Sequence, residues 1–162
     1  MGGTARPRSF TKRYFAKRQA SSDPDHPDTI ASLFKLARLL ASSTDPKVRN
    51  ASRAVELAKK AVESSPKGGH LWNALGIAQY RFGDQKAAIA SLEKSMELRQ
   101  GGDSFDWFFL AMAHWQLGEK DKARIWFDQA VGWMDKKQPT NEELWGFRAE
   151  AAELLGMKDK KD

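Results

Sequence analysis

The three histidines are the residues whose type could most readily support metal or acid–base chemistry. His26, His70 and His114 are scattered along the chain, and no pair of them has the spacing or the neighbouring carboxylates of a zinc site. Isolated histidines of this kind are typical of a solvated surface or a helical core. We therefore predict that the chain holds no metal ion.

The polar motifs near the glycines are equally poor in catalytic chemistry. Asp103 and Ser104 are better explained as a helix cap than as a nucleophile arrangement. Gly101 and Gly102 lack the lysine and the spacing of a phosphate-binding loop. The run Glu-Lys-Asp-Lys at 119–122 is typical of a solvated helix start with local ion pairs. The sequence thus predicts no catalytic residue, no cofactor and no enzymatic activity, which leaves a binding module.

Length and composition suit one domain that can bury its own core, since the chain has 162 residues. It contains no cysteine, which excludes disulfides and thiolate metal sites and fits a reducing compartment. The mean hydropathy is −0.64, and no apolar run approaches the roughly 20 residues of a membrane span. We therefore predict a cytoplasmic protein without a transmembrane segment.

The net charge of +6 is concentrated at the N-terminus. Residues 1–20 contain six basic residues and no acidic one, whereas residues 21–162 contain 21 of each sign. The body is therefore electrically neutral, which argues against a nucleic-acid partner for the fold itself. Two prolines, Pro24 and Pro27, lie in a polar run, so residues 1–28 are predicted to be a flexible basic tail. The alternative that residues 6–18 bind nucleic acid or an anionic membrane surface stays open.

The stretch from His70 to Met134 repeats itself at a lag of 35 residues. Such a period is typical of stacked helical units, none of which can bury its apolar face alone. The residues that recur are large or small apolar side chains and one glycine: Trp72 and Trp107, Leu75 and Leu110, Ala78 and Ala113, Gly83 and Gly118, Ala88 and Ala123, Leu92 and Phe127.

Helical spacing of apolar residues between glycine and proline breaks predicts an all-α fold. Thr140 and Glu143 form the signature of a capping box at the start of a last, amphipathic helix. We predict an α-solenoid over residues 29–156, with three helix-turn-helix repeats at about 29–66, 69–102 and 104–138, a capping helix at 141–155 and a frayed end at 157–162.

These units resemble the tetratricopeptide repeat, whose pattern is W-x2-L-G-x2-Y followed by A-x3-F. The first unit is divergent, and the resemblance covers residues 30–134. The chain is also similar to repeat segments of large bacterial signalling proteins, including serine/threonine kinases. The matching residues are Trp72-x2-Leu75-Gly76 with Ala88-x3-Leu92, and Trp107-x2-Leu110-Ala111 with Ala123-x3-Phe127.

The resemblance implies a peptide-binding or helix-binding groove formed by the first helix of each repeat. We predict an apolar partner segment that is anchored by Phe108, Met112 and Trp115. The alternative is that these side chains pack inside the array or against the tail, where Phe10, Tyr14 and Phe15 are candidates. The predicted groove residues, mostly aromatic, are Phe34, Arg38, Asn73, Ile77, Tyr80, Arg81, Phe105, Phe108, Phe109, Met112 and Trp115.

The predicted function is therefore that of an adaptor or scaffold that binds another protein or peptide. One alternative is a regulatory or leftover segment of a larger bacterial signalling protein, in which any catalytic activity belongs to another part. The sequence names neither the partner nor the oligomeric state.

Overall fold

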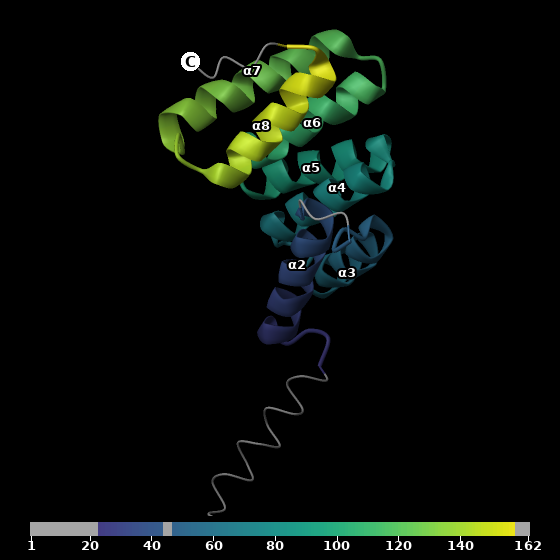
Figure 1. Cartoon of the computed structure of the whole chain (residues 1–162). Helices are drawn as coiled ribbons and strands as arrows, with labels where there is room; N and C mark the ends of the chain where they lie inside the picture. The colour runs from purple at the N-terminus through teal and green to yellow at the C-terminus, as the bar shows by residue number, and fades with distance from the viewer. Residues whose placement is uncertain (1–22, 44–46, 158–162) are drawn as a thin grey trace, which may run out of the picture.

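The structure is a computed structural model that describes residues 23–43 and 47–157. These residues form the predicted all-α stack of helical hairpins, which rises along the vertical of Figure 1. Most of the predicted basic tail, including Phe10 and Tyr14, and the end beyond residue 157 lie outside the described residues. The helices are α2 (Pro27–Ser42), α3 (Ala51–Ser64), α4 (Gly69–Phe82), α5 (Gln85–Leu98), α6 (Ser104–Gln116), α7 (Lys120–Lys137) and α8 (Glu142–Leu155).

The first described helix begins two residues before the predicted start of the domain at residue 29. Pro27 opens α2, because the first position of a helix needs no backbone N–H and favours the fixed φ of proline. The imidazole of His26 caps the helix by accepting the backbone N–H of Asp28 at 3.1 Å. His26 is therefore part of a helix start.

The last helix begins one residue later than predicted. Asn141 is its N-cap, and the Asn141 side chain accepts the backbone N–H of Leu144 at 3.0 Å. The predicted capping box between Thr140 and Glu143 was therefore wrong, because Asn141 is an equally good cap one position on. The Glu143 carboxylate instead pairs with Arg38 of α2.

Glycines in the left-handed region of φ follow α4 and α8 directly. After α6 the corresponding glycine comes one residue later, behind the C-cap Leu117. The φ angles are +96° at Gly83, +81° at Gly118 and +66° at Gly156. After each glycine the next backbone N–H donates to a carbonyl five residues earlier, a turn that only glycine makes without strain. Helix α8 thus shares its C-terminal turn with the first helices α4 and α6.

Small side chains allow the two helices of a hairpin to approach closely. In the second hairpin, Gly76 of α4 faces Leu92 and Ala88 of α5, and both of these residues are fully buried. A Cβ added at Gly76 would lie 2.6 Å from Leu92 Cγ, so only glycine fits without a shift. Gly76 is therefore a position at which α4 closely approaches a side chain of its partner helix α5.

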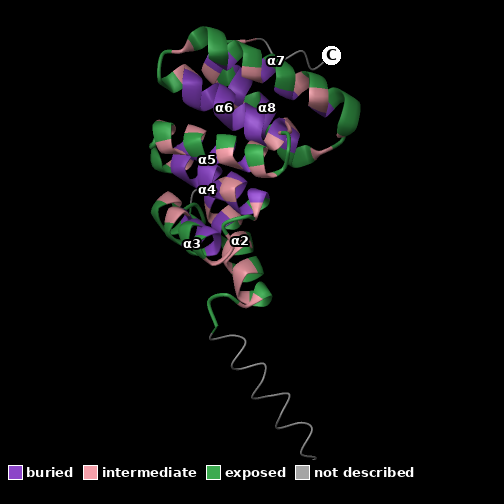
Figure 2. Ribbon diagram, turned by 180° about the vertical axis from the view of Figure 1, so that it is seen from behind, coloured by how far each residue is buried: buried purple, intermediate pink, exposed green. Residues whose placement is uncertain are grey.

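The first helices of the hairpins line one side of the stack, which we call the inner face. Helix α2 contacts α4, and α4 contacts α6, whereas α3 and α5 each pack between the first helix of their own hairpin and that of the next. Buried residues therefore concentrate on α4 and α6, which Figure 2 shows as the purple centre of the stack. Helix α8 lies across α6 (Figure 1).

Three tryptophans occupy the same place near the start of α4, α6 and α8. The indole N–H of Trp72 donates to the carbonyl of Pro66 at 2.8 Å, and that of Trp145 donates to the carbonyl of Pro139 at the same distance. Trp107 instead donates to the sulfur of Met96 at 3.2 Å. The match between Trp72 and Trp145 places α8 as the first helix of a further unit, which the 35-residue lag alone does not reveal.

The fit at Gly76 gives a testable difference between two glycines within helices. Gly132 of α7 is exposed, and an added Cβ meets no described atom within 4 Å. Gly132→Ala should raise the free energy of unfolding by about 1 kcal/mol through helix propensity. Gly76→Ala has the same propensity gain but crowds Leu92, so it should be less stable than Gly132→Ala by about 1–3 kcal/mol. Urea unfolding of the two variants measures this difference, and equal effects would show that α4 and α5 are not closely packed.

Candidate binding face

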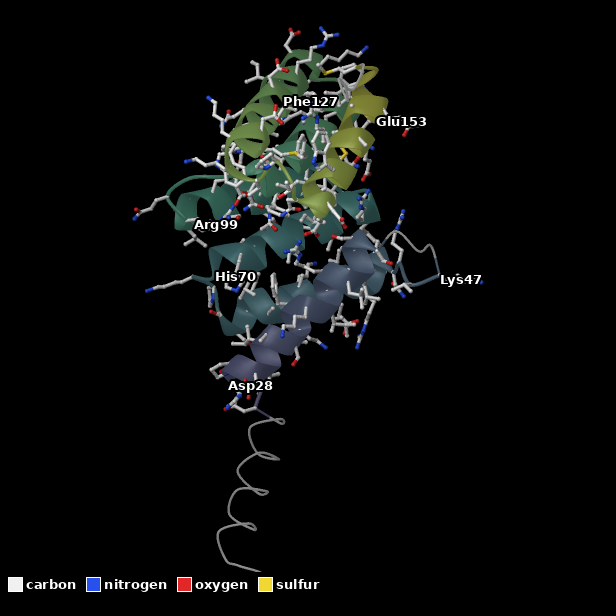
Figure 3. The ribbon with its side chains drawn as sticks, turned by 60° about the vertical axis from the view of Figure 1, so that its left-hand side comes forward. Asp28, Lys47, His70, Arg99, Phe127 and Glu153 are labelled. Carbon is white, nitrogen blue, oxygen red and sulfur yellow. The ribbon has the colours of Figure 1, made fainter. Side chains whose placement is uncertain are left out.

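Helix α8 crosses the inner face and is held there by side chains from three other helices. Its Glu150 forms an ion pair with Arg81 of α4, with Arg81 Nη2 and Glu150 Oε2 2.7 Å apart. Its Glu143 pairs with Arg38 of α2. The outer side of α8 is turned to solvent, as exposed Glu153 in Figure 3 shows.

Phe147 is the apolar centre of this contact. Its ring packs edge-on against Phe109 of α6, with centroids 4.8 Å apart and planes at 71°. A second edge contact joins it to Phe105, with centroids 6.4 Å apart. Because Phe147 is only 5% exposed, its burial stabilises the docking of α8 by about 1.5–3 kcal/mol.

Most of the predicted groove residues are covered in this arrangement. Phe108 and Met112, two of the predicted anchors, are fully buried, and Phe108 packs against Phe127 of α7 with ring centroids 5.9 Å apart. The third anchor, Trp115, is partly exposed and lies under the ammonium group of Lys120. Of the remaining predicted residues, Asn73, Ile77, Tyr80 and Phe109 are buried, while Phe34, Arg38, Arg81 and Phe105 are partly exposed.

One part of the inner face stays accessible beside the start of α8. We call it the arginine–aromatic patch, and it consists of Phe34, Arg38, His70 and Phe105. Phe34 and His70 pack edge-on with centroids 5.2 Å apart, and His70 is exposed. The Arg38 guanidinium lies 5.9 Å from the Phe34 centroid and 5.7 Å from the Phe105 centroid. This patch therefore joins α2, α4 and α6 and offers ring faces, an imidazole and a cation to a partner.

A buried carboxylate, which the sequence analysis missed, connects the second and third hairpins. Asp106 of α6 is fully buried, and its Oδ1 accepts hydrogen bonds from Asn73 Nδ2 at 2.9 Å and from Ser95 Oγ at 3.0 Å. Its Oδ2 pairs with Arg99 and accepts the backbone N–H of Asp103. Asn73, predicted to be a groove residue, is thus committed to this network.

Burial dominates the electrostatics of Asp106. Loss of solvation raises the pKa of its carboxyl group, although the hydrogen bond from Asn73 and the charge of Arg99 act in the opposite direction. The contribution of this group to stability is therefore fully present below the pKa of an unfolded aspartate and is lost as the pH rises through the folded pKa. The carboxylate is a structural element, because each of its oxygens is engaged within the protein.

The fold also shows where the other two histidines, His70 and His114, lie. His114 is buried at the end of α6, where its Nδ1 contacts the Glu119 carboxylate across the hairpin turn. That contact lowers the pKa of the Glu119 carboxyl group. His114 and His70 lie at opposite ends of their helices, so they do not converge on one site.

Comparison with known protein families agrees with this architecture. Two models described as tetratricopeptide repeat match residues 47–103 and 107–133, which together make up about half of the chain. The chain belongs to the tetratricopeptide repeat family. Repeats of this family are generally protein-interaction modules without enzymatic activity. No curated protein matches the chain.

The matched ranges include α3, α4 and α5 and most of α6 and α7, whereas α2 and α8 lie outside them. The inner contact made by α8 is therefore a feature of this chain that the family match does not describe. No helix among the described residues is both long enough and apolar enough to cross a membrane.

The Asp106 network predicts that loss of this buried aspartate destabilises the protein much more than loss of an exposed one. Asp106→Ala leaves the buried Asn73 and Ser95 donors without their acceptor, which should lower the free energy of unfolding by about 3 kcal/mol. Asp128→Ala, at an exposed position of α7, should change it by less than about 0.5 kcal/mol. Chemical denaturation at pH 7 measures both values. A loss at Asp106 no larger than that at Asp128 would contradict the network.

The buried hydroxyl of Tyr80 predicts that the stability of the protein falls at high pH. Loss of solvation, together with the nearby charge of Glu150, raises the pKa of its hydroxyl to about 12, although the charge of Arg81 acts in the opposite direction. Because the folded pKa exceeds the unfolded value of about 10, stability is fully present below pH 10 and is lost as the pH rises toward 12. The full loss is about 3 kcal/mol. Urea unfolding at pH 9 and pH 12 should show a smaller loss in Tyr80→Phe than in the wild type.

Proposed function

We propose that this protein is an adaptor that binds a peptide or helix of another protein on the inner face. The arginine–aromatic patch is the observation that carries this proposal. It contains Phe34, Arg38 and Phe105, three of the five partly exposed residues of the groove predicted from the sequence. Family membership supports the coarser role of an interaction module.

The composition of the patch suits protein recognition. Aromatic rings and arginine are enriched at the residues that contribute most of the binding energy in interfaces. Arg38 lies against two rings, Phe34 and Phe105, so its guanidinium is held in position before a partner arrives. Because Arg38 already pairs with Glu143 of α8, a partner can place an apolar side chain on the rings beside this ion pair.

Affinity capture from a native lysate tests this proposal. The substitutions are made at Phe34 and His70 and not at the predicted anchor Phe108. Phe108 is fully buried, and a charge placed there would disrupt folding. We expect Phe34→Ala combined with His70→Ala to fold and to lose the proteins that the wild type captures, with a loss of about tenfold or more in recovery. Circular dichroism and the unfolding temperature establish that the variant is folded.

A matched control removes exposed apolar surface elsewhere. Phe82→Ala truncates a side chain that is 60% exposed at the hairpin turn after α4. This control should capture the same proteins as the wild type. If the patch variant keeps them and Phe82→Ala loses them, the partner binds at the turns and the proposal is wrong.

A further inference from the structure

Helix α2 lies at one end of the stack, and one of its sides carries two exposed leucines (Figure 1). Leu36 is 43% exposed and Leu39 is 54% exposed. They are three positions apart and therefore share one side of the helix, where the partly buried Leu33 and Leu40 flank them. We call these four residues the leucine face. Phe34 is only two positions from Leu36 and so lies on a nearly opposite side, which separates the leucine face from the arginine–aromatic patch.

The positions of the two exposed leucines are buried elsewhere in the stack. Leu36 occupies the place of Leu75 in α4 and of Leu110 in α6, which are 5% and 0% exposed. Leu39 occupies the place of two alanines that are fully buried in the same helices. The leucine face is therefore the part of the repeat that the interior of the stack keeps from water.

In the interior, the second helix of the preceding hairpin covers this position. Leu75 of α4 packs in one buried cluster with Leu57 and Val62 of α3. Helix α4 also contacts α3 more extensively than α2. Before α2 the described residues contain no such helix, so the equivalent position meets solvent.

The chain before α2 has the length to supply a covering segment. Four or five residues separate each second helix from the first helix that follows it. The same spacing before Pro27 places the end of a covering segment at residue 21 or 22. Residues 9–22, which we call the N-terminal segment, are as long as α3 or α5, each of which has 14 residues. They lie outside the described residues.

The N-terminal segment has an aromatic residue at the position of a buried one. Leu57 of α3 and Leu92 of α5 are buried, and each lies 12 residues before the next first helix begins. Phe15 likewise lies 12 residues before Pro27. Most other residues of the segment are polar or basic, so a single aromatic anchor, and not a complete apolar stripe, carries the contact.

The small size of the leucine face favours a tethered occupant over a second copy of the chain. Two half-exposed leucines offer on the order of 100 Å² of apolar area, whereas a stable interface between proteins buries about 800 Å² on each partner. Covalent attachment supplies an effective concentration on the order of millimolar, so a small contact can hold a segment of the same chain. Leu36 lies roughly 14 Å along α2 from Pro27, a distance that the 12 residues after Phe15 can span.

We propose that the leucine face is the docking site of the N-terminal segment of the same chain, with Phe15 against Leu36 and Leu39. The segment then closes the end of the stack in the place of a preceding second helix. Docking also holds the charges of Arg13 and Lys17 beside α2, so this end of the fold becomes basic. The inference does not rest on the adaptor function, because the leucine face and the arginine–aromatic patch are separate surfaces.

Hydrogen exchange of the N-terminal segment in the full chain tests this docking. In Leu36→Asp combined with Leu39→Asp, the amides of the segment should exchange about fivefold or more faster than in the wild type. Ala31→Asp is the matched control, because Ala31 is exposed on α2 outside the leucine face. This control should leave the exchange rates of the segment unchanged. Circular dichroism and the exchange of the α4 amides establish that both variants are folded.

A double-mutant cycle supplies a second measurement that leaves α2 intact. Phe15→Ala should raise the equilibrium constant for urea unfolding about fivefold in the wild type, and should have no effect when Leu36 and Leu39 are already aspartates. Phe10→Ala is its control, because Phe10 stands at the place of the exposed Ser52 of α3. That substitution should change the equilibrium constant in neither background.

Four outcomes overturn the proposal. They are equal exchange of the segment in the wild type and in the leucine variant, and equal effects of Phe15→Ala in the two backgrounds. Protection of the segment that is lost on dilution assigns the leucine face to a second copy. Protection that appears only after addition of vesicles containing anionic lipid makes the segment a membrane ligand.

Discussion

The close approach of the two helices in each hairpin is the constraint on which the inner face depends. Gly76 meets Leu92 with no space for a Cβ, and the corresponding Ala111 and Ala123 of the third hairpin are fully buried. With this spacing the first helices converge so far that Arg38 of α2 lies over Phe105 of α6. Three helices that are distant in sequence thereby form one surface, and α8 can bridge all of them.

The Asp106 carboxylate adds a polar constraint to this apolar packing. It accepts hydrogen bonds from α4 and α5 while its own residue lies in the first turn of α6. Burial of a charge is unfavourable unless its hydrogen-bonding capacity is satisfied, so a change in the spacing of these helices would leave Asn73 or Ser95 without an acceptor. The network thus favours one register between the second and third hairpins, and it explains why Asn73 is not available to a partner.

Much of the fold could be predicted because its determinants are local. The recurrence of Gly83 at Gly118 marks two turns that need positive φ, and a helical period of apolar residues marks the helices between them. The candidate site was harder to predict, since α6 is apolar all round and its pattern does not say which side faces solvent. Phe108, for example, is buried against Phe127 of α7, a contact that the local pattern does not specify. The pairing of Asn73 with Asp106 joins residues 33 positions apart, for which no sequence motif exists.

Helix α8 departs from the repeat at Arg148, on the side that contacts α7. In α4 and α6 the equivalent position is occupied by Leu75 and Leu110. Both leucines are buried and attach their helix to the preceding hairpin. Arginine at 148 satisfies its charge with Asp135 and its apolar stem with Trp145, so less apolar surface is left for α7. Phe147, one residue earlier, then has its best burial against Phe105 and Phe109. Helix α8 therefore joins the stack through a polar contact with α7 and an aromatic contact with the inner face.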